Sequence, residues 1–292
     1  MLAETAVDDL RQAFEVRLAE QIAMPKSVPL NLQGAIRHAL IAPSKRLRPL
    51  AVYLVCDPAG AMRRAALDAG CAVEMVHTAS LILDDLPCMD NALTRRQRPT
   101  THIAYGESTA ILTAIALLNR AFGIIADIDA VSEDRRNELA RILSRAVGWE
   151  GLVTGQEIDM NERARLSGPR DVEELNRLKT GVLFVAAAEM GAALRGLEGA
   201  RRDAIRRFAT HLGIAFQTAD DLIDARATSA EAGKDTQKDG GKPTLVTLLG
   251  AEQARLSCTE HLASADAALA DSGIDPRALR GLMASFFAGA AS

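Results

Sequence analysis

The chain has 292 residues, enough for one large domain or two small ones. Aromatic residues make up only 3%, while alanine and leucine are plentiful, and this composition favours closely packed helices over sheets. A net charge of -4 argues against a nucleic-acid-binding protein. The four cysteines form no CxxC pair, which predicts a reduced, cytoplasmic protein.

The first segment has the pattern of an amphipathic helix. Leu10, Phe14, Leu18 and Ile22 follow one another at four-residue spacing, which places them on one helical face. Because the segment is acidic and amphipathic from its start, it is not expected to be a signal peptide.

Three later segments are apolar on most sides, which predicts long buried helices over residues 65–85, 108–128 and 182–197. Their uninterrupted apolar runs are too short to span a bilayer. Breaks are expected at residues 23–31, 42–49, 98–106, 166–171 and 225–244. The last of these is polar and glycine-rich, and we expect a mobile loop that closes over a ligand. With no convincing strand and no linker, we predict one all-α domain over residues 1–292.

Two aspartate clusters each end a strongly apolar helix. They are Asp84, Asp85 and Asp90, and Asp220, Asp221 and Asp224. Like charges at a helix C-terminus repel one another and oppose the macrodipole, so a compensating cation is expected. One such motif alone is usually a solvated helix end. Two of them, each followed by basic residues, predict a Mg²⁺ site, because Mg²⁺ takes carboxylate oxygens and keeps substrate phosphates as further ligands.

The spacing within the clusters has structural consequences. Asp220 and Asp224 are four residues apart and project from one helical face. Asp84 and Asp90 are six apart and diverge on a continuous helix. Pro87 lies between them, and a proline that bends the chain brings Asp90 back toward Asp84.

Many cations accompany these carboxylates. They are Lys45, Arg46, Arg48, Arg95, Arg96, Arg98, Lys179, Lys234, Lys238 and Lys242. Any one of them alone is more often a surface charge. Together with the aspartates they indicate a metal that holds a polyanion, and phosphate groups fit best. His77 lies on the same helical face as Asp84, either as a hydrogen-bonded core residue or as a ligand contact.

The reaction class follows from what accompanies the phosphate site. No Ser–His–Asp or Cys–His set and no P-loop are evident, so neither a covalent enzyme intermediate nor a nucleotide is indicated. A metal-bound phosphate as leaving group is the alternative. A pocket that is polar at one end and apolar along its length suits an alkyl diphosphate.

Several motifs, in this order along the chain, resemble those of the trans-polyprenyl diphosphate synthases, most closely the bacterial geranylgeranyl diphosphate synthases. They are SKRLRP (44–49), HTASLILDDLPCMDNALTRRQRPTTH (77–102), GQEIDM (155–160), LKTG (178–181), FQTADDLID (216–224) and GKDTQKDGGKPTLVTLLG (233–250). The resemblance implies a homodimer of the isoprenoid synthase fold, a bundle of long antiparallel helices around a deep central cavity. It also implies joining of isopentenyl diphosphate to an allylic diphosphate by ionisation, condensation and elimination, with several Mg²⁺ ions bridging the carboxylates and the diphosphate.

The resemblance also implies roles for individual residues. The main Mg²⁺ ligands are Asp84, Asp90 and Asp220, while Asp85, Asp221 and Asp224 either hold metal-bound waters or lie just outside the metal ligands. The allylic diphosphate is bound by Arg95, Lys179 and Lys234, and isopentenyl diphosphate by Lys45, Arg48, His77 and Arg96. Gln217 and Thr180 lie beside the cationic centre. Asn91, Gln97 and Ser44 depart from the family's usual aspartate, glycine and glycine without removing a principal ligand.

Product length depends on how far the cavity extends. Ala79, five residues before Asp84, stands where relatives with short products often carry an aromatic side chain. Alanine leaves room, so we expect a twenty-carbon product and expect Ala79→Phe to shorten it. Met75 and Val76, one turn deeper, are candidates for the floor.

Four other functions remain open at this stage. A farnesyl or longer-chain polyprenyl diphosphate synthase would use the same site with a different cavity. A terpene cyclase would normally carry an Asn/Ser/Glu metal motif as its second cluster. A non-catalytic partner subunit would typically lose one aspartate cluster, and both are intact here. A simple divalent-ion binder would not need the apolar helices or the surplus of cations.

Overall fold

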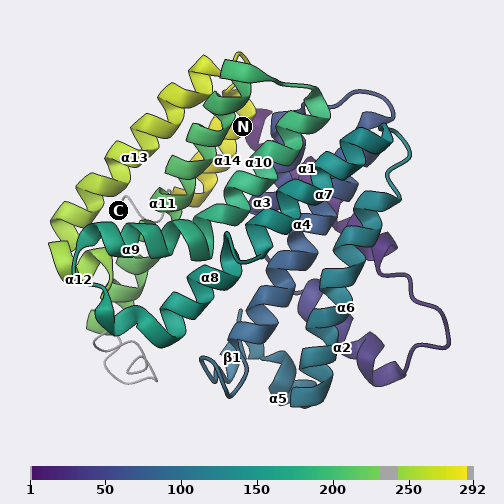
Figure 1. The fold of residues 1–292 in the computed structure, drawn as a ribbon, viewed down its shortest axis with the longest axis horizontal. Coiled ribbons are helices and arrows are strands. Elements are labelled where there is room, and N and C mark those ends of the chain that lie inside the picture. Colours follow the sequence, from purple (N-terminus) through teal and green to yellow (C-terminus); the bar gives the residue numbers. More distant parts are fainter. Residues whose placement is uncertain (1, 231–242, 288–292) are drawn as a thin grey trace.

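The computed structural model describes residues 2–230 and 243–287, most of which are helical (Figure 1). The helices before the midpoint are α1 (Leu2–Gln21), α2 (Leu30–Leu40), α3 (Leu47–Cys56), α4 (Met62–Asp84), α5 (Thr101–Tyr105), α6 (Glu107–Ala126) and α7 (Glu133–Val147). Those that follow are α8 (Leu152–Glu157), η1 (Ile158–Glu162), η2 (Arg163–Arg165), α9 (Pro169–Asn176), η3 (Arg177–Gly181), α10 (Val182–Arg195), α11 (Gly199–Ala230), α12 (Leu245–Leu249), α13 (Ala251–Asp271) and α14 (Arg277–Phe287).

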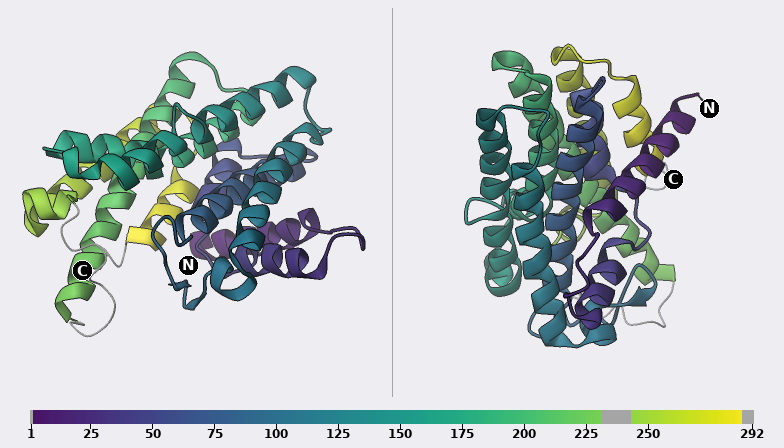
Figure 2. Two further views of the ribbon diagram at one scale, coloured as in Figure 1. Left: turned by 60° about the horizontal axis from the view of Figure 1, so that its bottom comes forward. Right: turned by 90° about the vertical axis from the view of Figure 1, so that its right-hand side faces the viewer.

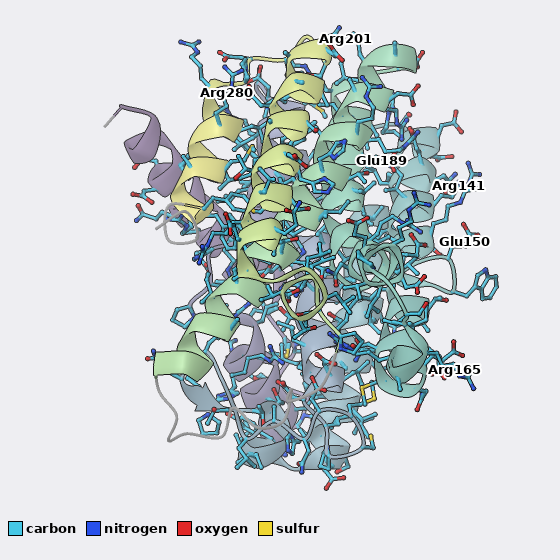
Figure 3. The ribbon with its side chains drawn as sticks, turned by 90° about the vertical axis from the view of Figure 1, so that its left-hand side faces the viewer. Arg141, Glu150, Arg165, Glu189, Arg201 and Arg280 are labelled. Carbon is cyan, nitrogen blue, oxygen red and sulfur yellow. The ribbon has the colours of Figure 1, made fainter. Side chains whose placement is uncertain are left out.

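The long helices lie side by side in one bundle (Figures 1 and 2). Helix α4 packs along α3 and α6, α10 packs along α3, α7 and α11, and α11 packs along α13. Charged side chains such as Arg141, Glu150 and Arg165 project from the outer surface (Figure 3). The predicted all-α bundle is confirmed, and so is the buried stripe of the first helix, where Phe14 and Leu18 are at most 1% exposed.

Helix α6 differs from its prediction as a buried helix. Ile111, Leu112 and Ile115 are 42%, 56% and 49% exposed, because no other described element covers that side. Both α4 and α6 are also long and apolar enough to cross a membrane by length and composition, although core helices of soluble proteins pass the same test. The apolar window of α4 is 72% buried in the bundle, and that of α6 only 39%.

All five predicted breaks overlap a helix or a strand; α2 begins at Leu30 and α9 at Pro169, inside two of them. Helix α3 already begins at Leu47, since Pro49 lies in its first turn, where a proline costs no helical hydrogen bond. Strands β1 (Thr94–Arg95) and β2 (Arg98–Pro99) form a short antiparallel hairpin that was not predicted, and α5 follows at once. Helix α11 continues to Ala230, so residues 225–230 of the expected break are helical. Residues 231–242, on which the rest of the expected closing loop falls, lie outside the described residues.

Pro87 acts as the sequence predicts. Helix α4 ends at Asp84, and the chain then turns so that the backbone nitrogen of Asp90 donates a hydrogen bond to the carbonyl oxygen of Asp84 at 2.9 Å. The residue before a proline is driven out of helical geometry, which places the end of the helix here. The turn returns the third aspartate of the motif to the end of the helix that carries the first two.

Candidate active site

A cavity of about 360 Å³ opens beside the C-terminal end of α4. Its polar lining residues are Arg48, His77, Ser80, Asp84, Gln156, Glu157, Asn161, Lys179 and Thr180, and its apolar ones are Val76, Leu81, Leu83, Met89, Leu118, Val147, Leu152, Val153, Met160 and Leu183. Nearly all of them stand on α3, α4, α6, α7, α8, η1, η3 and α10. The expected cavity, polar at one end and apolar along its length, is therefore present.

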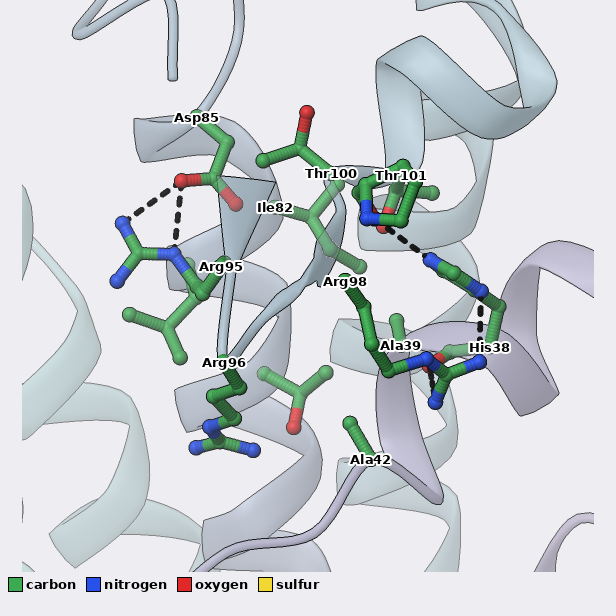
Figure 4. A pocket seen from close by; sticks show the side chains of 13 residues that line it. His38, Ala39, Ala42, Ile82, Asp85, Arg95, Arg96, Arg98, Thr100 and Thr101 are labelled. Carbon is green, nitrogen blue, oxygen red and sulfur yellow. Dashed lines mark hydrogen bonds and ion pairs between the residues drawn. The ribbon is translucent and has the colours of Figure 1, made fainter. Parts of the chain in front are cut away.

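Asp84 lies at the polar end and is surrounded by donors. Its carboxylate accepts a hydrogen bond from Gln156, and the Lys179 ammonium nitrogen lies 3.6 Å from its Oδ1. Arg95 Nε donates to Asp85 Oδ1 at 2.7 Å (Figure 4), while Arg95 Nη2 lies 3.9 Å from Asp84 Oδ2. Burial raises the pKa of Asp85 in spite of Arg95. Two cations, Arg95 and Lys179, thus converge on the first two aspartates.

Lys179 is held from its other side by Asp159. The buried carboxylate of Asp159 accepts hydrogen bonds from Lys179 and from Arg163. Burial acts to raise the pKa of Asp159, but these two cations outweigh it and hold that pKa below its usual range. Lys179 stands in η3, a single π-helical turn between α9 and α10. Such turns interrupt regular helices and often occur at functional sites.

The second aspartate cluster reaches the cavity through Gln217. Thr180 Oγ1, on the cavity wall, donates to Gln217 Oε1 at 2.7 Å, and Gln217 Nε2 donates to Asp221 Oδ1 at 2.9 Å. Asp220, on the same helix, is close enough to raise the pKa of Arg48 electrostatically. The side chain of Asp224 and the whole of Lys234 lie outside the described residues.

Arg48 and His77 meet at the polar wall. Arg48 Nη1 lies 3.4 Å from His77 Nε2. Burial lowers the pKa of Arg48 to about 10, so it remains a cation at neutral pH. Burial, and then the charge of Arg48, hold the pKa of His77 well below its usual range. His77 is therefore neutral at neutral pH, and its position on the cavity wall beside Arg48 favours the ligand-contact interpretation over that of a core residue.

The arginines of the β1–β2 hairpin have different environments (Figure 4). Arg98 Nη2 lies 3.0 Å from His38 Nδ1, and this contact ties the hairpin to α2. Arg96 makes no hydrogen bond or ion pair with any side chain of the described ranges. Burial lowers its pKa. Arg98 is thus engaged within the protein, while Arg96 remains available to an anion.

Two further sequence-based assignments are modified by the structure. Ala79 is fully buried in the packed interior, and the cavity wall is formed instead by its neighbour Ser80. Of the two candidates for the floor, Val76 borders the cavity and Met75 does not.

Among residues 2–230 and 243–287, no three His, Cys, Asp or Glu side chains lie close enough together to hold a metal ion.

Gln156 and Asp159 were missed as functional residues. Both belong to the motif GQEIDM, within which neither residue was assigned a role of its own. Their partners, Asp84 and Lys179, lie 72 and 20 residues away along the chain. The signal that could have found them is the spacing of three between an amide and a carboxylate, which places both near one helical face.

Comparison with known proteins places this site in a family. The polyprenyl synthetase family model matches residues 30–270. The geranylgeranyl diphosphate synthase of Pseudescherichia vulneris is 43% identical over 263 residues, 89% of this chain and 84% of its own. That of Pantoea ananas is 44% identical over 234 residues, covering 78% and 76% of the two chains. The chain therefore belongs to the polyprenyl synthetase family.

Solved structures agree with the fold. The geranyltransferase from Helicobacter pylori, complexed with magnesium and isoprenyl diphosphate, superposes with a TM-score of 0.87 over 99% of both chains at 29% identity. The FPP/GFPP synthase from Zymomonas mobilis, an apo structure, gives a TM-score of 0.83 over 98% of both chains at 35% identity.

Proposed function

We propose that this chain is a prenyltransferase that condenses isopentenyl diphosphate with allylic diphosphates and releases geranylgeranyl diphosphate. The observation that carries the proposal is the cavity beside the end of α4, where Asp84, Lys179 and other polar side chains share the lining with many aliphatic ones. This arrangement matches a substrate with a charged head and a hydrocarbon tail. The geranylgeranyl diphosphate synthases at 43% and 44% identity support the same reaction.

The donor set fits magnesium. Asp84, Asp85 and Asp90 lie at one helix end and Asp220 and Asp221 on α11, and all offer the hard oxygen atoms that Mg²⁺ prefers. The diphosphate would supply further oxygens, and the Helicobacter pylori geranyltransferase is likewise complexed with both magnesium and isoprenyl diphosphate. When bound, Mg²⁺ would neutralise the charge that develops on the departing diphosphate.

The side chains of the protein bind and orient both substrates. Arg95 and Lys179, with Lys234, hold the allylic diphosphate. As its C–O bond breaks, the double bond of isopentenyl diphosphate attacks the allylic carbon, and a proton leaves the neighbouring carbon for the released diphosphate. The hydroxyl of Thr180 and the amide of Gln217 present oxygen dipoles beside the positive charge.

Lys45, Arg48, His77 and Arg96 hold isopentenyl diphosphate in this proposal. Arg48 and Arg96 keep N–H groups free of carboxylates within the described chain, and neutral His77 can donate a hydrogen bond without adding charge. Ser80, one turn before Asp84, is the small wall residue that leaves room for a twenty-carbon chain.

The assembly and the compartment are part of the same proposal. A second copy of the chain covers the apolar face of α6 formed by Ile111, Leu112 and Ile115, which would give a homodimer. All four cysteines are free, and three of them are buried, which supports a reducing cytoplasm.

The test is product analysis. Purified protein and Mg²⁺ are incubated with labelled isopentenyl diphosphate and, separately, with five-, ten- and fifteen-carbon allylic primers. A twenty-carbon diphosphate from any primer is the expected result. A final product of another length would support the condensation reaction and contradict the assignment of a twenty-carbon product. No elongation from any primer, in protein that is folded by circular dichroism, would overturn the synthase in favour of a cyclase or a partner subunit.

A further inference from the structure

Three cations in different environments stand at the N-terminal end of α3: Lys45 and Arg46 just before it and Arg48 in its first turn. Arg46 is fully buried and is bound by two carboxylates, with Nε 2.7 Å from Glu15 Oε1 and Nη1 2.5 Å from Glu74 Oε1. Lys45 and Arg48, on either side of it, form no ion pair with any carboxylate of the described ranges. Arg46 therefore fixes the backbone at the start of α3. The charges of Lys45 and Arg48 remain available to an anion.

Lys45 and Arg48 contact aromatic rings instead of carboxylates. Lys45 Nζ lies 4.3 Å from the centroid of the Phe286 ring. The guanidinium carbon of Arg48 lies 4.3 Å from the Phe184 centroid and 5.7 Å from that of Phe216. All three distances are within the range of cation–π attraction, which stabilises a cation without neutralising it.

The rings themselves form a continuous group. Phe286 stacks on Phe216 with centroids 4.3 Å apart and planes at 17°, and Phe216 lies 5.0 Å from Phe184. Phe216 directly precedes Gln217 on α11, while Phe286 comes from α14 at the other end of the chain. The stack thus connects α14 to both cations and to the helix that carries the second aspartate cluster.

We propose that Phe286 is a positioning residue for the anion-binding pair Lys45 and Arg48. Its face holds the Lys45 ammonium directly, and through Phe216 it supports the rings that hold Arg48. A carboxylate in the same place would compete with the diphosphate for these cations, whereas a ring orders them and leaves their N–H donors free. The inference rests on the proposed function, because it assigns Phe286 to the isopentenyl diphosphate side of that site.

Three variants distinguish an effect of the aromatic ring face of Phe286 from an effect of its packing alone. Phe286→Leu removes the face and keeps an apolar side chain. Phe286→Trp keeps a face, and tryptophan is the strongest cation–π partner. Phe287→Leu is the matched control: Phe287 is as buried as Phe286, at 8% against 7% exposure, and packs on its edge at 4.8 Å. No cation lies over Phe287 in the described chain.

The measurement is steady-state kinetics with each substrate varied in turn, with circular dichroism melting of every variant. We expect Phe286→Leu to raise the KM for isopentenyl diphosphate about two- to fivefold, the size of an exposed cation–π contact, with little change in kcat or in the allylic KM. Phe286→Trp and Phe287→Leu should keep the wild-type KM.

Equal increases for Phe286→Leu and Phe287→Leu, or an increase for Phe286→Trp as large as that for leucine, would show a packing role only and overturn the inference. If Phe286→Leu fails to fold, Phe286→Trp is compared with Phe287→Leu instead. A raised KM for isopentenyl diphosphate in Phe286→Trp alone would overturn the inference, and a wild-type KM in both variants would support it. Wild-type protein that does not elongate would contradict the proposed function instead, so the two failures are distinguishable.

Discussion

The backbone of Gly155 approaches that of Lys179 so closely that a Cβ on residue 155 would stand 2.5 Å from the Lys179 nitrogen. This contact joins α8 to the π-helical turn η3 and sets where the Lys179 side chain begins. Asp159, which follows one turn after Gly155, then binds the ammonium group. The position of the Lys179 ammonium group therefore depends on the absence of a side chain at Gly155 as well as on the Asp159 carboxylate.

Gly155→Ala should displace η3 and lower kcat about 10- to 100-fold, because displacements of about 1 Å in an active site have effects of this size. Gly123→Ala is the matched control, since a Cβ there meets only the end of a flexible side chain, Arg120 Nη1, at 3.7 Å. Kinetics and melting temperatures of both variants are compared. Equal kcat values for the two would contradict a positioning role for the close contact.

The β1–β2 hairpin contains unfavourable backbone geometry at Gln97. Arg96 and Gln97 form its two-residue turn, with φ angles of +53° and +60°. Both belong to the left-handed region, which a two-residue turn of type I′ requires and which favours glycine at its second position. Gln97 is exposed, so its side chain loses little packing when replaced.

Gln97→Gly should stabilise the protein by about 1 kcal/mol, because a residue with a Cβ is unfavourable in this conformation by that amount. Gln97→Ala should leave stability nearly unchanged, since alanine meets the same steric conflict. Urea unfolding of the three proteins measures the difference. A glycine variant no more stable than the alanine variant would show that the turn relaxes without cost.

Product length should respond to Ser80 rather than to Ala79. Ser80 lines the cavity one turn before Asp84, and Ser80→Phe would place a ring across the path of the growing chain. Its product should shorten to fifteen or ten carbons. Ala79 is fully buried, so Ala79→Phe should overpack the interior and destabilise the protein by about 1–3 kcal/mol. Product sizes by mass spectrometry and melting temperatures distinguish the two; shortening by Ala79→Phe alone would reverse the assignment.

Local patterns explain why much of the fold and site could be predicted. The buried stripe that includes Phe14 and Leu18 follows from helical periodicity, and the return of Asp90 toward Asp84 follows from Pro87. Both depend on interactions within a few residues, where sequence spacing determines geometry. The pairing of many carboxylates with many cations likewise indicates a phosphate site from residue types alone.

The features that escaped prediction depend on distant partners. The hydrogen bond from Gln156 to Asp84 joins residues 72 positions apart, and Lys45 and Phe286 are brought together from opposite ends of the chain. No periodicity encodes such contacts. The sequence predicted Ala79, and the structure places its neighbour Ser80 on the cavity wall instead. The two differ by a rotation of about 100° around α4, the angle between adjacent helical residues, which is finer than the pattern of apolar residues resolves.

Acid should weaken the packing of α11 on α13 through one histidine pair. His211 Nδ1 lies 2.9 Å from His261 Nδ1. Burial, then His261, then Arg207 lower the pKa of His211. A histidine whose pKa is lower in the folded state binds fewer protons there, so its contribution to stability is present above the unfolded pKa of about 6.5 and is lost as pH falls below it.

His261→Gln removes one of the like charges and should make the decline in melting temperature between pH 7 and pH 5 shallower than in the wild type. Glu260→Gln, at an exposed neighbouring position on α13, is the control and should keep the wild-type slope. His77 contributes in the same direction and is present in every variant, so some pH dependence should remain. Identical slopes for wild type and His261→Gln would exclude the pair as an acid-sensitive contact.

The exposed face of α6 should determine the oligomeric state. Leu112 is 56% exposed between Ile111 and Ile115, in a helix whose apolar window is only 39% buried. Burying this face against a second copy would remove apolar area from water, and a glutamate at its centre would have to be desolvated without a partner. Leu112→Glu should therefore shift sedimentation from dimer toward monomer. Leu256→Glu, at a 49% exposed position on α13, should leave the dimer intact. A wild-type protein that sediments as a monomer at micromolar concentration, or equal behaviour of the two variants, would show that this face is not the dimer contact.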